Sequence, residues 1–163
     1  MEKWNNRSPE VANLLNPAFC ATLINQTIQE YERHSKSGLP ISLLYLILPV
    51  LLHKKTREII NSKTNMVKCL QNYPEILIGF SERAKQLIDY TNEALEFLLS
   101  RGVVKIVDAK INTANNLPVG KIKQLVDRNT EIKDCILKAA HLGRWFSNMK
   151  TEESIYIAWG VKP

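Results

Sequence analysis

The chain has 163 residues, which fits a single domain over 1–163. Of these residues 45% are hydrophobic, enough for a buried core and too many for intrinsic disorder. Its net charge of +6 favours anionic partners such as nucleic acid, a membrane surface or an acidic protein face, although solubility alone explains the same excess in many small subunits. Three widely spaced cysteines, Cys20, Cys69 and Cys135, argue against a secreted disulfide framework and for a reducing, cytoplasmic location.

The sequence also bears on membrane association. The first residues lack the apolar stretch of a signal peptide. The strongly apolar run at 39–52 is shorter than the roughly 20 residues that span a bilayer, and Pro40 and Pro49 interrupt it. We therefore expect a buried helix here and no membrane partner.

Helical signals fill the first half of the chain. Ser8–Pro9 and Asn16–Pro17 each combine an N-capping side chain with a proline in the first turn, and Gly38 is placed as the C-terminal stop of the second helix. In chain order, the predicted helices are a short one from Ser8, a longer one from Asn16 to about Ser35, the apolar segment from Pro40 to Leu52 that Pro49 kinks or ends, a basic one at 53–58 and a short one at 64–72 that ends before Pro74.

The second half changes from helical to strand periodicity and back. The β-branched runs on both sides of the Asp108–Ala109 turn predict a β-hairpin over 103–114. The other predicted elements are helices at 81–89 and 91–101 joined by a turn at Tyr90, a loop at 115–120, a short helix at 120–127 and an amphipathic helix at 130–146. The last element, at 154–159, could be a helix or a strand, and the cap signal before it favours a helix.

The order of helix, turn, helix and hairpin over residues 81–114 is typical of a winged helix. The predicted fold class is therefore mainly α with a small β-hairpin, a winged-helix domain elaborated with extra N- and C-terminal helices. In DNA-binding winged helices the second helix carries basic or amide side chains that reach the bases. Here its exposed positions include Glu93 and Glu96, which repel phosphate, so protein docking is favoured over base reading.

Exposed cations could contact DNA phosphate or an acidic protein face, and a solvated helix surface is the alternative interpretation. The residues predicted for this nucleic-acid or partner surface are Lys54, Lys55, Arg57, Lys63, Lys68, Lys105 and Lys110. Aromatic residues gather near the two ends of the chain, where they either anchor a protein interface or pack together to close the core. The predicted interface aromatics are Trp4, Trp145, Phe146, Tyr156 and Trp159.

The sequence offers little for catalysis. His34, His53 and His141 are isolated, and zinc-ligand spacing, nucleotide-binding loops and nucleophile motifs do not occur. Cys20 and Cys135 lie on predicted apolar faces, where cysteine acts as a small hydrophobic residue. We predict a non-enzymatic protein with no catalytic residue, metal or cofactor. The rival interpretation is a cysteine enzyme assembled from distant positions.

Short motifs along nearly the whole chain point to one family. They are EVANLLNPAF at 10–19, GLP at 38–40, LILPVLLHK at 46–54, GFSERA at 79–84, ALEFLL at 94–99, LGRWF at 142–146 and the tail 156–163. With these motifs the chain resembles the middle components of bacterial three-component ABC systems, such as the LmuC-like subunit of Lamassu anti-phage defence.

The resemblance implies a subunit encoded between an SMC- or Rad50-like ABC ATPase and an effector, often a nuclease. It further implies that this subunit binds the ATPase and couples DNA sensing to the effector. The expected partners are then the ATPase subunit, the effector and, through the complex, DNA. The alternative, which follows from the winged-helix pattern, is a stand-alone DNA-binding transcriptional regulator.

Overall fold

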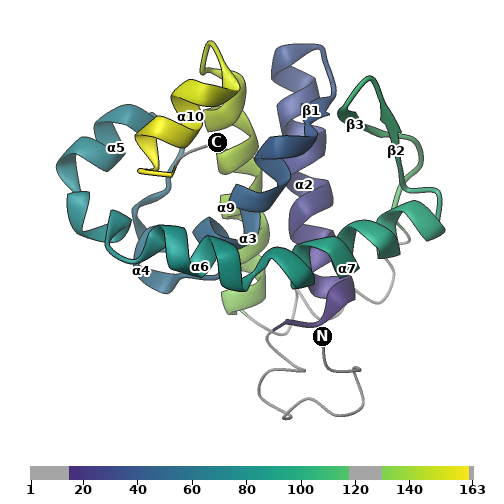
Figure 1. Cartoon of the computed structure of the whole chain (residues 1–163), viewed down its shortest axis with the longest axis horizontal. Helices are drawn as coiled ribbons and strands as arrows, with labels where there is room; N and C mark the ends of the chain where they lie inside the picture. Colours follow the sequence, from purple (N-terminus) through teal and green to yellow (C-terminus); the bar gives the residue numbers. More distant parts are fainter. Residues whose placement is uncertain (1–14, 118–129, 162–163) are drawn as a thin grey trace.

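The computed structural model describes residues 15–117 and 130–161 and is mainly helical with one small antiparallel sheet (Figure 1). The predicted mainly-α class with a β-hairpin is thereby confirmed. The helices are α2 (Pro17–Ser35), α3 (Leu44–Leu51), α4 (Lys54–Ile59), α5 (Met66–Asn72), α6 (Phe80–Gln86), α7 (Ile88–Ser100), α9 (Thr130–Ser147) and α10 (Glu152–Ala158), with 3-10 turns at Ile41–Leu43 and Pro74–Leu77.

The long helices α2 and α9 pack against each other at the centre of the fold (Figure 1). Gly143 lies at their closest approach, where a Cβ would collide with the backbone oxygen of Thr27. The Thr27 hydroxyl donates across the same contact to the carbonyl of Ala139, at 3.2 Å. Small residues allow two helix backbones to come this close, so the pair forms a rigid centre for the other elements.

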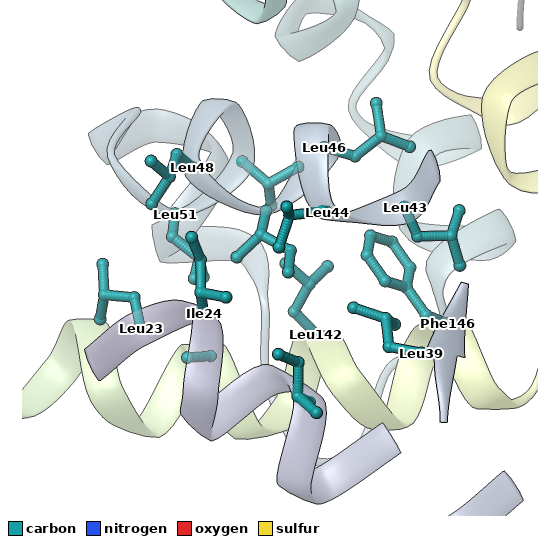
Figure 2. Packing of buried hydrophobic residues seen from close by; sticks show 14 of the residues in the cluster. Leu23, Ile24, Leu39, Leu43, Leu44, Leu46, Leu48, Leu51, Leu142 and Phe146 are labelled. Atoms are coloured by element: carbon teal, nitrogen blue, oxygen red, sulfur yellow. The ribbon is translucent and has the colours of Figure 1, made fainter. Parts of the chain in front are cut away.

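The apolar helix α3 lies across this pair, as the sequence predicted for a segment that is apolar all round (Figure 2). Leu44 and Leu51 from α3 meet Leu23 of α2 and Leu142 of α9 in one cluster. Each fully buried leucine contributes about 1.5–3 kcal/mol relative to an exposed one. The hydrophobic centre of the domain is therefore built by α2, α3 and α9.

Two predictions about the ends of these helices need correction. Lys36, with φ of 57°, takes the left-handed position after α2 that we assigned to Gly38. Gly38 is required for a different reason, because a Cβ there would collide with the side chain of Asn112 on the neighbouring strand. Pro49 does not end its helix, since α3 continues through it to Leu51 and the backbone N–H of Leu52 still bonds the carbonyl of Leu48.

The sheet has three strands in the order β1 (Leu39–Pro40), β3 (Lys110–Thr113) and β2 (Val104–Val107). The predicted hairpin is confirmed, with β2 and β3 joined by Asp108 and Ala109, both at positive φ. The third strand was not predicted, because two residues carry no strand periodicity. Pro40 is tolerated in β1 because it forms a non-hydrogen-bonded pair with Lys110, in which no backbone N–H is needed.

The winged helix stays a prediction. A helix-turn-helix joins its two helices by a turn of three or four residues, whereas Leu87 alone separates α6 from α7. The predicted break at Tyr90 is therefore wrong, because Tyr90 lies inside α7. The short helices predicted from Ser8 and at 120–127 lie outside the described residues. In the described part of the chain, no helix is long and apolar enough to cross a membrane.

Candidate interaction surfaces

Four of the predicted surface cations are exposed around α4 and α5: Lys54, Lys55, Lys63 and Lys68. The side chain of Lys54 is 75% exposed, and its ammonium lies 4.0 Å from the carboxylate of Glu58, also largely exposed. An ion pair at this distance in water is worth less than about 1 kcal/mol. Lys54 is therefore available to an anionic partner.

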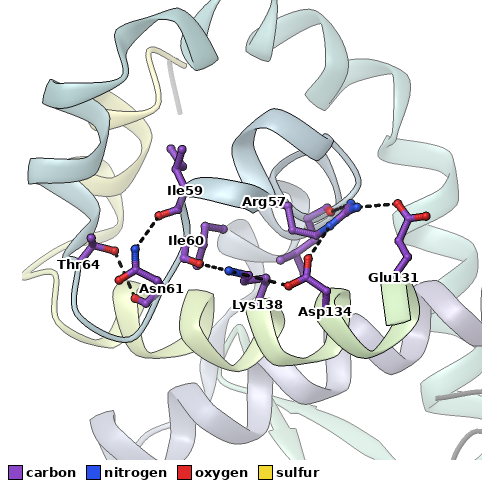
Figure 3. A network of polar contacts seen from close by, with 9 residues as sticks. Arg57, Ile59, Ile60, Asn61, Thr64, Glu131, Asp134 and Lys138 are labelled. Atoms are coloured by element: carbon purple, nitrogen blue, oxygen red, sulfur yellow. Dashed lines mark hydrogen bonds and ion pairs between the residues drawn. The ribbon is translucent and has the colours of Figure 1, made fainter. Parts of the chain in front are cut away.

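Arg57, in the same run, is not part of this surface. Only 4% of it is exposed, and its guanidinium is bound on three sides (Figure 3). It donates to the carboxylates of Glu131 (2.7 Å) and Asp134 (3.3 Å) on α9, and to the carbonyl of Leu51 at the end of α3 (2.9 Å). Arg57 joins three helices, and its predicted role in partner binding is corrected to a structural one.

The segment that follows α4 is held on α9 by a ladder of side-chain donors. Lys138 donates to the carbonyl of Ile60, as Figure 3 shows. The guanidinium of Arg144 donates to the carbonyl of Ser62 at 2.9 Å, and the indole N–H of Trp145 to that of Thr64 at 2.8 Å. We refer to these contacts, together with those of Arg57, as the α9 clamp. The clamp fixes the loop that carries Lys63.

Arg83 of α6, which the sequence analysis did not consider, is half-buried and bound to backbone carbonyls. Its guanidinium donates to the carbonyls of Ile76 and Ile78, both at 3.0 Å, and lies 5.5 Å from the centre of the Phe80 ring. The pKa of His53 is lowered by burial first, then by the positive charges of Arg83 and Lys55. Arg83 and Lys55 therefore both act on the His53 ring, although 28 positions separate them in the sequence.

The two predicted hairpin lysines form a separate group. Lys105 and Lys110 are exposed, and with Val107 and Asn112 they line a shallow hollow of about 310 Å³. The ammonium of Lys110 donates to the hydroxyl of Ser37 at 2.9 Å. Figure 1 shows the hairpin and α5 at opposite sides of the molecule, so the fold does not bring the two lysine groups together.

The predicted interface aromatics are mostly core residues. Trp145, Phe146 and Trp159 are 1% exposed, and Trp159 stacks on Phe80 with ring centroids 4.7 Å apart. They close the core, which was the alternative interpretation of the sequence, and cannot anchor a partner. Tyr156 is only partly buried, and its hydroxyl donates to the carbonyl of Ser42 at 2.6 Å. Trp4 lies outside the described residues.

Tyr156 also lines an apolar hollow of about 550 Å³ between α3, α6, α7 and α10. Small side chains at Ser81 and Ala84, together with Gly160, leave this space, and the rings of Tyr45 and Tyr156 flank it. The Tyr45 hydroxyl donates to Asn92, at 3.0 Å, so its ring is fixed. A concave apolar site with rigid aromatic walls is suited to a bulky side chain of a protein partner.

Comparison with known protein families gives a match. The family described as ABC-three component (ABC-3C) system Middle Component 3 matches residues 4–163. The chain belongs to this family. No curated protein and no solved structure matches it. A middle component, by its family description, is one of three components of an ABC system, so it partners the other two.

The three thiols of this middle component are poor nucleophiles. Cys20, Cys69 and Cys135 are all buried and free. Burial raises the pKa of all three thiols, that of Cys20 to about 12, so they are protonated at neutral pH. A catalytic cysteine needs the opposite shift. Among the described side chains, no group of three or more His, Cys, Asp or Glu residues could hold a metal ion.

Proposed function

We propose that this middle component is the non-catalytic adaptor between an SMC- or Rad50-like ABC ATPase and an effector, in an anti-phage assembly of the Lamassu kind. The observation that carries the proposal is the family match over residues 4–163. The apolar hollow supports it, because it gives the chain a place to bind, and the burial of the three thiols argues against the rival cysteine enzyme. In this assembly DNA sensed by the ATPase activates the effector, which we take to be a nuclease.

The apolar hollow is the proposed docking site for one of the two other components. Its test uses the exposed Ser81, which lines the hollow, and the exposed Glu82 beside it on α6, which does not. The substitution Ser81→Trp fills the hollow and should release one component from the co-expressed, affinity-purified complex. The matched variant Glu82→Trp should keep both. Recovery of the wild-type chain without either component would refute the adaptor function.

The second part of the proposal assigns the exposed lysines of α4 and α5 to DNA held by the ATPase. The double substitution Lys54→Glu, Lys55→Glu should weaken DNA binding by the complex. It should also reduce the slope of log K against log salt concentration by about 0.9 for each lost phosphate contact. The double substitution Lys133→Glu, Lys150→Glu, at two exposed lysines in and after α9, changes the net charge equally and is the control. An unchanged affinity and slope in the double variant would refute this part alone.

A stand-alone winged-helix regulator remains the rival function. Its favourable feature is the hairpin with the exposed Lys105 and Lys110, which could touch phosphate. Against it stands Glu96, exposed on α7, the helix that would have to read the bases. Sequence-specific DNA binding by the purified chain in the absence of the other components would favour the regulator.

A further inference from the structure

Part of the backbone of β2 points away from the sheet. The order β1-β3-β2 leaves β2 as an edge strand, drawn outermost in the sheet in Figure 1. The pair Val107 and Lys110 closes a two-residue turn, and such a pair exchanges both backbone hydrogen bonds. At the other end of the hairpin, the N–H of Ala114 bonds the carbonyl of Val103 at 2.8 Å, which keeps the same alternation.

This alternation fixes which groups are free. Lys105 and Val107 direct their N–H and C=O groups inward to β3, so Val104 and Ile106 must direct theirs outward. Within residues 15–117 and 130–161, neither Val104 nor Ile106 has another backbone hydrogen bond. Val104 is 3% exposed, so its groups are out of reach, whereas Ile106 is 42% exposed. The edge therefore presents one donor and one acceptor, both from Ile106, to an added strand.

The short length of β2 and the charge of Lys105 protect this edge only in part. Natural edge strands are commonly short, charged or bulged so that they do not pair with other chains. β2 carries one charge, Lys105, and next to it the β-branched Ile106 and Val107 are 42% and 47% exposed. Exposed aliphatic residues on an open strand are typical of a site that pairs by strand addition.

We propose that the outer edge of β2 binds an extended, acidic–apolar segment of another component of the ABC system by β-strand addition. This inference rests on the adaptor function proposed above. The register gives the chemistry of the segment. The residue opposite Lys105 would stand in the non-hydrogen-bonded position, where side chains are closest, so an Asp or Glu fits there. The residue opposite Ile106 would lie on the other face of the strand, where an apolar side chain fits.

Charge favours a partner segment over a second copy of this chain. The chain has a net charge of +6, and Lys105 and Lys110 line one hollow of the hairpin with a single acid, Asp108. If two copies of β2 paired around Lys105, the Lys105 side chains of the two copies would lie directly opposite each other and repel. An acidic segment would instead be attracted by these positive charges.

The test uses the fact that successive residues of β2 direct their backbone groups alternately inward to β3 and outward. Ile106→Pro removes one outward N–H and leaves the inward bonds of Lys105 and Val107 to β3 in place, and proline is tolerated at such edge positions. In the co-expressed complex it should weaken binding of one component at least tenfold. Ile106→Ala, which keeps the N–H, should have a much smaller effect. Lys105→Glu should weaken the same contact several-fold and reverse its salt dependence.

Hydrogen exchange on the wild-type chain gives a second readout that does not depend on the folding of a variant. The amide of Ile106 should exchange fast in the free chain and slowly in the complex, whereas the amides of Lys105 and Val107 should be protected in both. An assembled complex with unchanged exchange at Ile106 and full binding by Ile106→Pro overturns the inference and leaves the adaptor function intact.

Two other outcomes would also overturn it. If the free wild-type chain sediments as a dimer and Ile106→Pro makes it monomeric, the edge pairs with a second copy. If the wild-type chain assembles with neither component, the adaptor function fails first, and the inference that rests on it falls for that separate reason.

Discussion

The substitution Arg57→Met tests whether Arg57 stabilises the fold through the α9 clamp rather than binding a partner. Methionine preserves most of the volume of the buried stem but removes the guanidinium. The carbonyl of Leu51 then loses a charge-assisted donor inside the protein, which costs about 1.5–3 kcal/mol. The two ion pairs add little, because Glu131 and Asp134 are 69% and 41% exposed and regain water, so each is worth about 0–1 kcal/mol.

We therefore expect Arg57→Met to lower the free energy of unfolding by about 3 kcal/mol. For a chain of this size that corresponds to a fall in Tm of about 6–12 °C. Urea unfolding followed by circular dichroism measures the change. Lys54→Met, on the exposed surface of the same helix, is the matched control and should change stability by less than about 0.5 kcal/mol. A loss below about 1 kcal/mol for Arg57→Met would refute the reasoning.

Three further predictions follow from single positions. Ala109→Gly should stabilise the hairpin by about 1 kcal/mol in thermal unfolding, because a non-glycine residue at φ of 57° is strained, and an unchanged or lower Tm would contradict this. Gly143→Ala should destabilise the fold by at least about 2 kcal/mol, because the added methyl meets the backbone of Thr27; a gain, as helix propensity alone predicts, would be evidence against the close approach. Cys20 should resist iodoacetamide at pH 8 until urea unfolds the chain. Because burial raises its pKa from 9.0 to about 12, Cys20 stabilises the fold below pH 9, and this contribution is lost between pH 9 and 12. Cys20→Ala should flatten stability over that range, and rapid labelling of the folded chain would contradict the burial of this thiol.

The elements that the sequence predicted well are those with local signals. The helix from Pro17 to Ser35 has an N-cap at Asn16, whose side chain accepts from the backbone N–H of Ala18 at 2.9 Å. The hairpin around Asp108 and Ala109 was found from β-branched runs and a turn. The break between α6 and α7 was misplaced at Tyr90, because the next residue, Thr91, is of a type that favours the N-cap position. It lies buried inside α7, where its hydroxyl bonds the carbonyl of Leu87 at 2.8 Å.

The candidate site was predicted less well, because exposure is not a local property. Lys54, Lys55 and Arg57 look alike in the sequence, yet two are exposed and the third is buried. The difference comes from Glu131 and Asp134, which lie 74 and 77 positions further along the chain. The apolar hollow could not be predicted at all, because residues from four helices line it.

By itself, the sequence determined the helical class, the hairpin and the family, because periodicity, caps, turns and motifs are each contained in a few consecutive residues. Only the tertiary structure decided which cations and aromatics are available to a partner and which hold the fold together. It also decided which backbone groups of β2 point away from the sheet, since a strand has an outer edge only once β3 has paired with its other side. The physical reason is the same in each case: burial and pairing depend on contacts between residues far apart in the chain, and these form only when the helices pack.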